Sequence, residues 1–329
     1  MKRISICFSN DPNQIELLYV AIKSLVHEFE AAGRHEEYAL DIYVIAIDLS
    51  DEMKKIISLC AVSSVAVTRV IFHDYELQGR YPLSRFKNVE IVTLVFFVPV
   101  FFPKLQRMIY LDSDMLVTGD ITELWEVNLR DRWLGVVDKV YDRSLKARRI
   151  IQPLNPLTTP VNSGAVLLDL RKMRMDDISS QLDAFVAKNQ RWLRMPDQDA
   201  LEYVAFDRLR LEHKWNWRGV ARISEIYWSA PSEKAVAEYE EILPSLVHFQ
   251  WPIRPNRYRL RNRWFDEWNQ YYNGLGLAPL KKQAYGLLIF VKISVGTHRL
   301  GSAKTMRLYL RFAWHTLLSL PKYIYYRLA

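Results

Sequence analysis

The sequence predicts an α/β fold in which helices cover both faces of a sheet, followed by a basic, mostly helical C-terminal appendage. Over the first 170 residues, short apolar runs of strand length alternate with segments whose apolar residues recur at helical spacing. The 329 residues are 50% hydrophobic with only 11 Gly and 14 Pro, which excludes disordered and collagen-like chains. No acidic residue follows Glu267, and residues 281–329 carry nine Lys or Arg, so a nearly neutral body ends in a cationic tail.

The elements of the body follow one another in a regular order. Residues 4–8 are an apolar strand, and Asp11 before Pro12 is a typical helix start because it places a capping side chain ahead of a proline. Apolar residues then recur at helical spacing from Ile15 to Phe29. The pattern goes on to predict a strand at 40–47, a helix at 50–59, and strands at 65–72, 108–111, 134–137 and 165–170.

Cysteine usage and apolar runs limit the class of protein. Cys7 and Cys60 are too few for a disulfide framework or a cysteine-based zinc site, which favours a reducing cytosol. The longest apolar run, residues 91–103, contains Pro99 and is shorter than the roughly 20 residues that span a bilayer. We therefore expect an intracellular protein without a targeting or membrane-spanning segment.

The stretch with the clearest chemistry is residues 107–117, RMIYLDSDMLV, where an apolar strand leads into Asp112-Ser113-Asp114. In extended backbone, Asp112 and Asp114 would point to the same side with Cα atoms about 6.6 Å apart. Two carboxylates at that spacing can bind one divalent cation such as Mn²⁺ or Mg²⁺. Taken alone, the pattern also fits solvated acids in a turn that ends a strand.

Other motifs accompany this pair in a fixed order: FSNDPN at 8–13, VNSGAVLLDL at 161–170, PDQDAL at 196–201 and VHF at 247–249. Together they resemble glycosyltransferase family 8, which includes bacterial lipopolysaccharide galactosyl- and glucosyltransferases and glycogenin. The resemblance spans residues 4–256. It implies a GT-A fold, a Rossmann-like mixed sheet, in a nucleotide-sugar transferase domain at 1–256. An Arg- and aromatic-rich connecting segment at 257–280 and the tail at 281–329 would follow.

The resemblance also implies an activity: a hexose, galactose or glucose, moves from a UDP-sugar to a saccharide acceptor with retention of configuration. Mn²⁺, with Mg²⁺ as the alternative ion, would be held by Asp112, Asp114 and His248. The implied catalytic residues are Asp138, Asp197 and Gln198, and the implied nucleotide-sugar contacts are Ser9, Asp11, Asn13, Asp112, Ser113, Asn162, Ser163, Trp251 and Arg254. From the residues alone, Asp11 and Asn13 equally fit a helix cap and a turn, and His248 fits a packed histidine.

The expected mechanism follows from the side chain at one position. Retaining glycosidases use a carboxylate nucleophile beneath the sugar. The family motifs place the amide of Gln198 near that position, and amides are poor nucleophiles. We therefore favour front-face substitution, in which the leaving diphosphate helps to deprotonate the acceptor hydroxyl.

The sequence departs from the family pattern at positions that concern donor binding, and one of them is an Arg of the family that is replaced within the run Thr93-Leu94-Val95-Phe96. Trp251 replaces a Gly, Arg254 replaces a Lys, and Gln14 replaces a Tyr that stacks on uracil. These changes bear on the affinity for the donor and on its identity. The alternative functions are therefore a nucleotide-sugar hydrolase and a catalytically weak sugar-nucleotide binder at the membrane.

The tail at 281–329 admits several interpretations: a solvated face, a nucleic-acid-binding surface, a folded appendage or a membrane-attachment segment. Its aromatic residues, such as Phe312 and Trp314, alternate with isolated cations, which favours attachment to an anionic membrane surface. We expect no nucleic-acid partner. The predicted acceptor is a lipopolysaccharide or glycolipid core, and the predicted location is cytoplasmic, at the inner face of the cell membrane.

Overall fold

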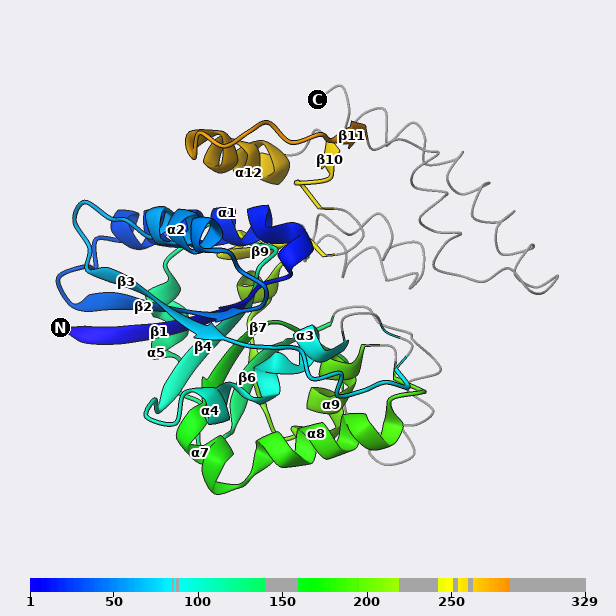
Figure 1. Cartoon of the computed structure of the whole chain (residues 1–329). Helices are drawn as coiled ribbons and strands as arrows, with labels where there is room; N and C mark the ends of the chain where they lie inside the picture. Colours follow the sequence, from blue (N-terminus) through cyan, green and yellow to red (C-terminus); the bar gives the residue numbers. More distant parts are fainter. Residues whose placement is uncertain are drawn as a thin grey trace, which may run out of the picture.

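A seven-stranded mixed sheet forms the centre of the computed structural model (Figure 1). The structure describes residues 1–84, 86, 89–139, 159–193, 195–218, 242–250, 254–259 and 263–284. The strand order is β3-β2-β1-β4-β7-β6-β8. The strands are β1 (Lys2–Ser9), β2 (Tyr38–Ala46), β3 (Thr68–Asp74), β4 (Arg107–Asp112), β6 (Leu134–Asp138), β7 (Val161–Asp169) and β8 (Leu209–Leu211).

The sheet is mixed because β7 runs against both of its neighbours. The four strands β3, β2, β1 and β4 are mutually parallel, and β8 is parallel to β6. By contrast, β7 is antiparallel to β4 and to β6. The carboxyl ends of β1, β4 and β6 therefore meet the beginning of β7 at one edge of the sheet, which confirms the predicted mixed α/β architecture.

Helices cover both faces of the sheet (Figure 1). Along β1, Ile6 and Phe8 belong to one hydrophobic cluster and Cys7 to the other, as the twofold alternation of a strand requires. The first cluster includes residues of α1 (Ile15–Ala31), α2 (Asp51–Cys60) and α5 (Ile121–Glu126). The second includes residues of α3 (Val89–Thr93), η2 (Leu94–Phe96), α4 (Val98–Phe101), α7 (Leu170–Met175), α8 (Ile178–Asn189) and α9 (Pro196–Val204).

Two helix starts lie where capping side chains predict them. Asp11 caps the short 3-10 helix η1 (Pro12–Gln14) by accepting a hydrogen bond from the Asn13 amide at 3.0 Å, and α1 follows directly. Ser50 caps α2 in the same way, through the Met53 amide at 3.2 Å. The predicted strand at 165–170 is too short, because β7 begins four residues earlier.

A second, two-stranded sheet packs beside α1. In it β5 (Met115–Val117) is antiparallel to β9 (Leu246–His248), and both belong to a hydrophobic cluster with α1 and α12 (Arg263–Gly274). Three large side chains of α12, Trp264, Phe265 and Trp268, are buried in this cluster. Residues 263–274 of the predicted connecting segment thus form a helix that packs on α1, as Figure 1 shows above the sheet.

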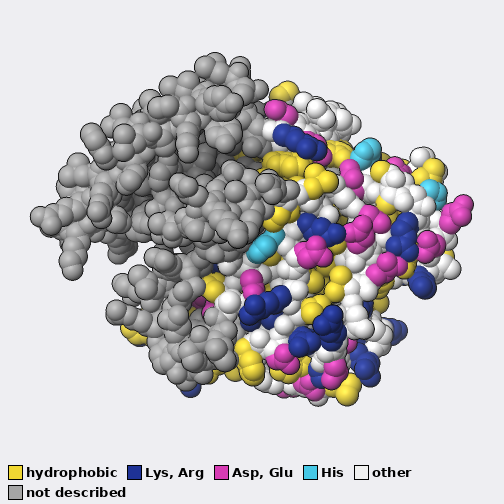
Figure 2. Space-filling model, turned by 180° about the vertical axis from the view of Figure 1, so that it is seen from behind, with side chains coloured by type: hydrophobic (Ala, Val, Ile, Leu, Met, Phe, Trp, Pro, Cys, Tyr) yellow, Lys and Arg dark blue, Asp and Glu magenta, His cyan; other side chains and the backbone are white. Residues whose placement is uncertain are grey.

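The C-terminal part contributes one more pair of strands, β10 (Tyr258–Arg259) and β11 (Gln283–Ala284). Residues 285–329, which make up nearly all of the predicted tail, lie outside the described residues. On the face seen in Figure 2, cationic and anionic side chains are interspersed over the described surface. Among the described helices, none combines the length and the apolar character needed to cross a bilayer.

Candidate functional site

The two aspartates of the D-x-D motif converge through a turn. The strand β4 ends at Asp112, Ser113 and Asp114 form the turn, and β5 begins at Met115. The expectation of extended backbone through this motif was therefore wrong. The chain turns because it leaves the central sheet to pair with β9, and this pairing places Met115 opposite His248.

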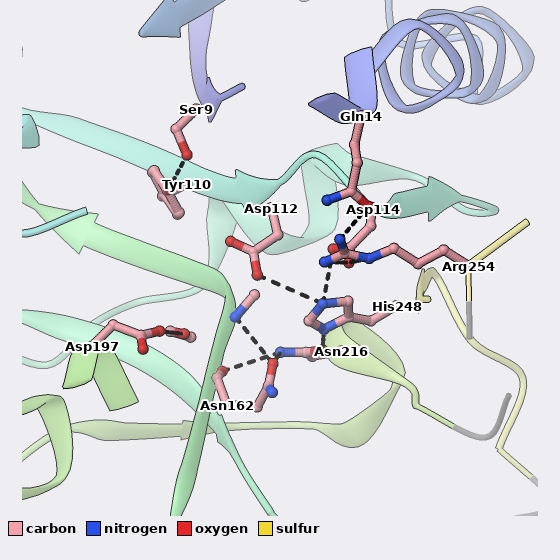
Figure 3. Close-up of polar contacts among 12 residues, drawn as sticks. Ser9, Gln14, Tyr110, Asp112, Asp114, Asn162, Asp197, Asn216, His248 and Arg254 are labelled. Atoms are coloured by element: carbon pink, nitrogen blue, oxygen red, sulfur yellow. Dashed lines mark hydrogen bonds and ion pairs between the residues drawn. The ribbon is translucent and has the colours of Figure 1, made fainter. Parts of the chain in front are cut away.

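Three potential metal ligands meet beside this turn: Asp112, Asp114 and His248 each offer one atom, and these atoms all lie within 4.8 Å of one another (Figure 3). His248 Nε2 is 3.0 Å from Asp114 Oδ1 and 3.6 Å from Asp112 Oδ2. Ligands about 2.1 Å from an octahedral ion stand about 3 Å apart, so these separations fit one divalent cation. Two carboxylates and an imidazole also suit Mn²⁺ chemically.

A buried amide pair fixes the orientation of His248. His248 Nδ1 is 2.9 Å from Asn216 Oδ1, and Asn216 Nδ2 donates to Asn162 Oδ1 at 2.7 Å. Because Asn216 presents its oxygen, Nδ1 is the donor of this bond, which leaves Nε2 as the ring nitrogen that faces the two carboxylates and is placed to bind an ion between them. Asn216 belongs to η3 (His213–Asn216) and is fully buried. A hydrogen bond that orients the imidazole is typical of metal-binding histidines, so this contact also fits a site for a divalent ion.

Gly164 in β7 makes room for the histidine ring. A Cβ added at Gly164 would lie 2.3 Å from His248 Cε1 and 2.5 Å from His248 Nδ1. The family-like Asn-Ser-Gly sequence therefore places a glycine where any side chain would displace the ring.

Charges around the metal site differ between the two aspartates. Burial acts to raise the pKa of Asp114, but the guanidinium of Arg254 and the ring of His248 outweigh it and hold the pKa well below its usual range. Desolvation, with the charges of Asp114 and Asp197, raises the pKa of Asp112 above its usual value, although His248 acts in the opposite direction. The two carboxylates are thus electrostatically distinct.

The predicted nucleotide loop is joined to the metal site by hydrogen bonds. Arg254 Nε donates to Asp114 Oδ2 at 2.8 Å, and Arg254 Nη1 donates to Gln14 Oε1. Gln14 Nε2 donates to Asp11 Oδ2 at 2.7 Å, and Asn13 bonds to Asp11 Oδ1. A chain of hydrogen bonds therefore connects Asp11, with Asn13 attached to it, through Gln14 and Arg254 to Asp114.

Polar atoms without protein partners lie beside the metal site. Asn162 Nδ2, Asp197 Oδ1 and Gln198 Oε1 are buried and have no hydrogen-bond partner among the described residues. Asp197 and Gln198 lie in the first turn of α9, and Asp197 Oδ2 accepts a hydrogen bond from Ser163. Burial raises the pKa of Asp197. Buried polar atoms are normally satisfied, so this set is available to the hydroxyl groups of a ligand.

The remaining predicted residues have other contacts. Ser9 Oγ is 2.7 Å from the hydroxyl of Tyr110, and Ser113 lies in the D-x-D turn. Asp138 ends β6 and pairs with Arg208 at 3.3 Å and Arg210 at 3.1 Å, so its charge is balanced by two arginines. Trp251 lies outside the described residues.

Sequence reasoning missed Asn216 and Tyr110. Asn216 lies between Trp215 and Trp217, and a polar residue flanked by two tryptophans is the only local signal of its buried role. Tyr110 is part of an apolar strand, and nothing in that pattern distinguishes it from a packing residue.

The sequence is similar to known glycosyltransferases over the part of the chain that contains the fold and the site. The family model described as "Glycosyl transferase family 8" matches residues 5–256. The chain is 25% identical to glycosyltransferase GlyF of Streptococcus pneumoniae over 69% of its own length and 53% of that protein. It is 26% identical to the lipopolysaccharide 1,2-glucosyltransferase of Escherichia coli over 61% of its length and 58% of that protein. The chain therefore spans little more than half the length of these two relatives.

A solved structure shares the fold. The galactosyltransferase LgtC, in complex with donor and acceptor sugar analogues, superposes with a TM-score of 0.67 at 18% identity. The superposition covers 84% of this chain and 98% of LgtC. The predicted GT-A fold is thereby confirmed.

Proposed function

The chain belongs to glycosyl transferase family 8, and from this premise we propose that it transfers a hexose from a UDP-sugar to a saccharide acceptor. The observation that carries the proposal is the convergence of Asp112, Asp114 and His248 at the edge of the sheet where the strands of open α/β folds present ligands. A Mn²⁺ ion held there would neutralise the charge of the leaving diphosphate.

The donor would lie across the residues around this point. Arg254 offers a planar guanidinium suited to phosphate, and Asp11 with Asn13 offers polar groups to the uridine. The unpartnered atoms of Asn162, Asp197 and Gln198 offer hydrogen bonds to the sugar hydroxyls. The names of the relatives favour glucose or galactose as the sugar, and a lipopolysaccharide or glycolipid core as the acceptor.

Retention of configuration would proceed on the front face of the sugar. Gln198 is an amide, the carboxylate of Asp197 is hydrogen-bonded by Ser163, and that of Asp138 is paired with arginines. Gln198 and the arginine-paired Asp138 offer no free carboxylate nucleophile, which supports a direct displacement in which the diphosphate assists deprotonation of the acceptor hydroxyl. Asp197, whose Oδ1 has no partner among the described residues, is the carboxylate on which this mechanism has to be tested. Isolation of a glycosyl adduct on Asp138 or Asp197 would refute this mechanism.

Turnover of UDP-glucose and UDP-galactose with Mn²⁺ and a panel of saccharide acceptors tests the activity. We expect acceptor-dependent release of UDP, reduced by about 100-fold or more in Asp114→Asn because a metal ligand is lost. Asp131→Asn is the matched control, because Asp131 has a highly exposed side chain. Release of UDP without acceptor would instead identify a hydrolase, and UDP binding without turnover would identify a sugar-nucleotide binder.

We also propose that residues 281–329 attach the enzyme to the inner face of the cell membrane. The sequence supports this through nine cations interleaved with aromatic residues and no acidic residue. Replacing Lys304, Arg307 and Arg311 by Glu in the full chain should abolish binding to vesicles containing anionic phosphatidylglycerol. Activity on a soluble acceptor should remain. Unchanged binding to those vesicles, compared with purely zwitterionic ones, would refute the attachment.

A further inference from the structure

The negative charge of Asp114 is shared between the candidate metal site and an arginine. Asp114 Oδ1 lies 3.0 Å from His248 Nε2, on the side where the three ligand atoms meet. Asp114 Oδ2 accepts from Arg254 Nε at 2.8 Å and lies 2.6 Å from Arg254 Nη2. Both carboxylate oxygens of Asp114 therefore have a partner, and two nitrogens of Arg254 contact the same oxygen, Oδ2 (Figure 3).

A second contact holds the guanidinium in this position. Arg254 Nη1 donates to Gln14 Oε1, and Gln14 Nε2 in turn donates to Asp11 Oδ2 at 2.7 Å. Gln14 and Asp114 are buried, and the side chain of Arg254 is only 20% exposed. The chain Asp11–Gln14–Arg254–Asp114 thus links the first loop, the D-x-D turn and the segment after β9.

The position of Arg254 has an electrostatic consequence for a cation at the metal site. The guanidinium of Arg254 on one oxygen of Asp114 partly neutralises the carboxylate, which weakens the attraction of the other oxygen for a divalent ion. The guanidinium and the divalent ion also repel each other at short range. A diphosphate offers Arg254 an alternative partner, because the guanidinium fork binds phosphate oxygens in bidentate fashion.

We propose that Arg254 competes with the divalent ion for Asp114. Gln14 holds the guanidinium on Asp114, and Arg254 releases this carboxylate only when a diphosphate binds the guanidinium in its place. The inference rests on the proposed UDP-sugar function of the same site. The divalent ion and the nucleotide then bind cooperatively, and the affinity for the ion alone is low. Gln14 is a positioning residue in this device, since it acts only through Arg254.

Binding of Mn²⁺ to the full-length protein tests the proposal without any measurement of turnover. The loss of the electron paramagnetic resonance signal of free aqueous Mn²⁺ gives the affinity, with and without UDP. In Arg254→Gln, we expect Mn²⁺ alone to bind about tenfold more tightly or better, because a nearby positive charge is removed. The factor by which UDP tightens Mn²⁺ binding should shrink in the same variant.

Gln14→Leu provides a second variant that keeps the arginine. It removes one hydrogen bond from the guanidinium, so Mn²⁺ alone should bind a few-fold more tightly, while Arg254 remains available to UDP. Arg132→Gln is the matched control for the arginine, because Arg132 pairs with Asp207 at 3.1 Å and precedes β6 at the end opposite Asp138. Gln181→Leu in α8 is the control for the glutamine. Neither control should change Mn²⁺ affinity.

The outcomes separate the two proposals. If the wild type binds UDP with Mn²⁺ but Arg254→Gln and Gln14→Leu bind Mn²⁺ alone no more tightly than the wild type, the competitor role is refuted and the proposed function stands. If the wild type binds neither Mn²⁺ nor UDP, the proposed function fails and the competitor role fails with it.

Discussion

Gly164→Ala should abolish the metal site without altering any ligand. The new methyl group would lie 2.3 Å from His248 Cε1, 2.5 Å from His248 Nδ1 and 2.9 Å from Met115 Cε. Overpacking of this kind costs about 1–3 kcal/mol of unfolding free energy. Relief requires movement of the imidazole, which breaks its bond to Asn216 at a further cost of about 1 kcal/mol. Nε2 then no longer faces Asp112 and Asp114.

Thermal unfolding with UDP, in Mn²⁺ and in EDTA, measures both effects. At about 100 times the dissociation constant, ligand should stabilise the wild type by about 2.7 kcal/mol, a rise of several degrees in Tm. Gly164→Ala should show a lower Tm in EDTA and no Mn²⁺-dependent rise. Gly135→Ala is the control, because the atoms nearest to its Cβ would belong to the flexible side chains of Leu211 and Leu129, at 3.1 and 3.2 Å, and not to the metal site. A wild-type Mn²⁺-dependent rise in Gly164→Ala would refute the role assigned to His248.

Two further predictions concern buried polar groups. Asn216→Leu should weaken Mn²⁺ binding about 10- to 100-fold, because His248 loses the partner that orients it; unchanged affinity in a Mn²⁺ titration would contradict this. Burial raises the pKa of Asp41, but the hydrogen bonds from Arg3 and Arg69 outweigh it and hold the pKa below its usual value. A depressed pKa stabilises the fold above the unfolded-state value of about 3.9, so Asp41→Asn should lower the unfolding free energy by about 1–3 kcal/mol at neutral pH. This difference should shrink as the pH falls below about 4 in urea titrations, and a constant difference would argue against the ion pairs.

Much of the fold follows from local features of the sequence. Because a buried strand needs apolar side chains on both faces, apolar runs predicted β1, β2, β3, β4, β6 and β7 to within a few residues at most ends, but not β5. Asp11 and Ser50 predicted helix starts, since a capping side chain satisfies amides only two or three residues ahead. The family resemblance carried by the D-x-D pair and His248 predicted the three candidate metal ligands, which the fold brings together.

The tertiary structure decided how these residues meet. Asp112 and Asp114 converge through a turn because β5 leaves the central sheet to pair with β9, a partner more than a hundred residues away. Arg254 reaches Asp114 across 140 positions and Gln14 across 240. The sequence alone determined which segments form strands and helices and which side chains can bind a metal, because those properties are local. The orientation of His248, the need for Gly164 and the sharing of Asp114 depend on contacts between distant segments, and only the folded chain brings those segments together.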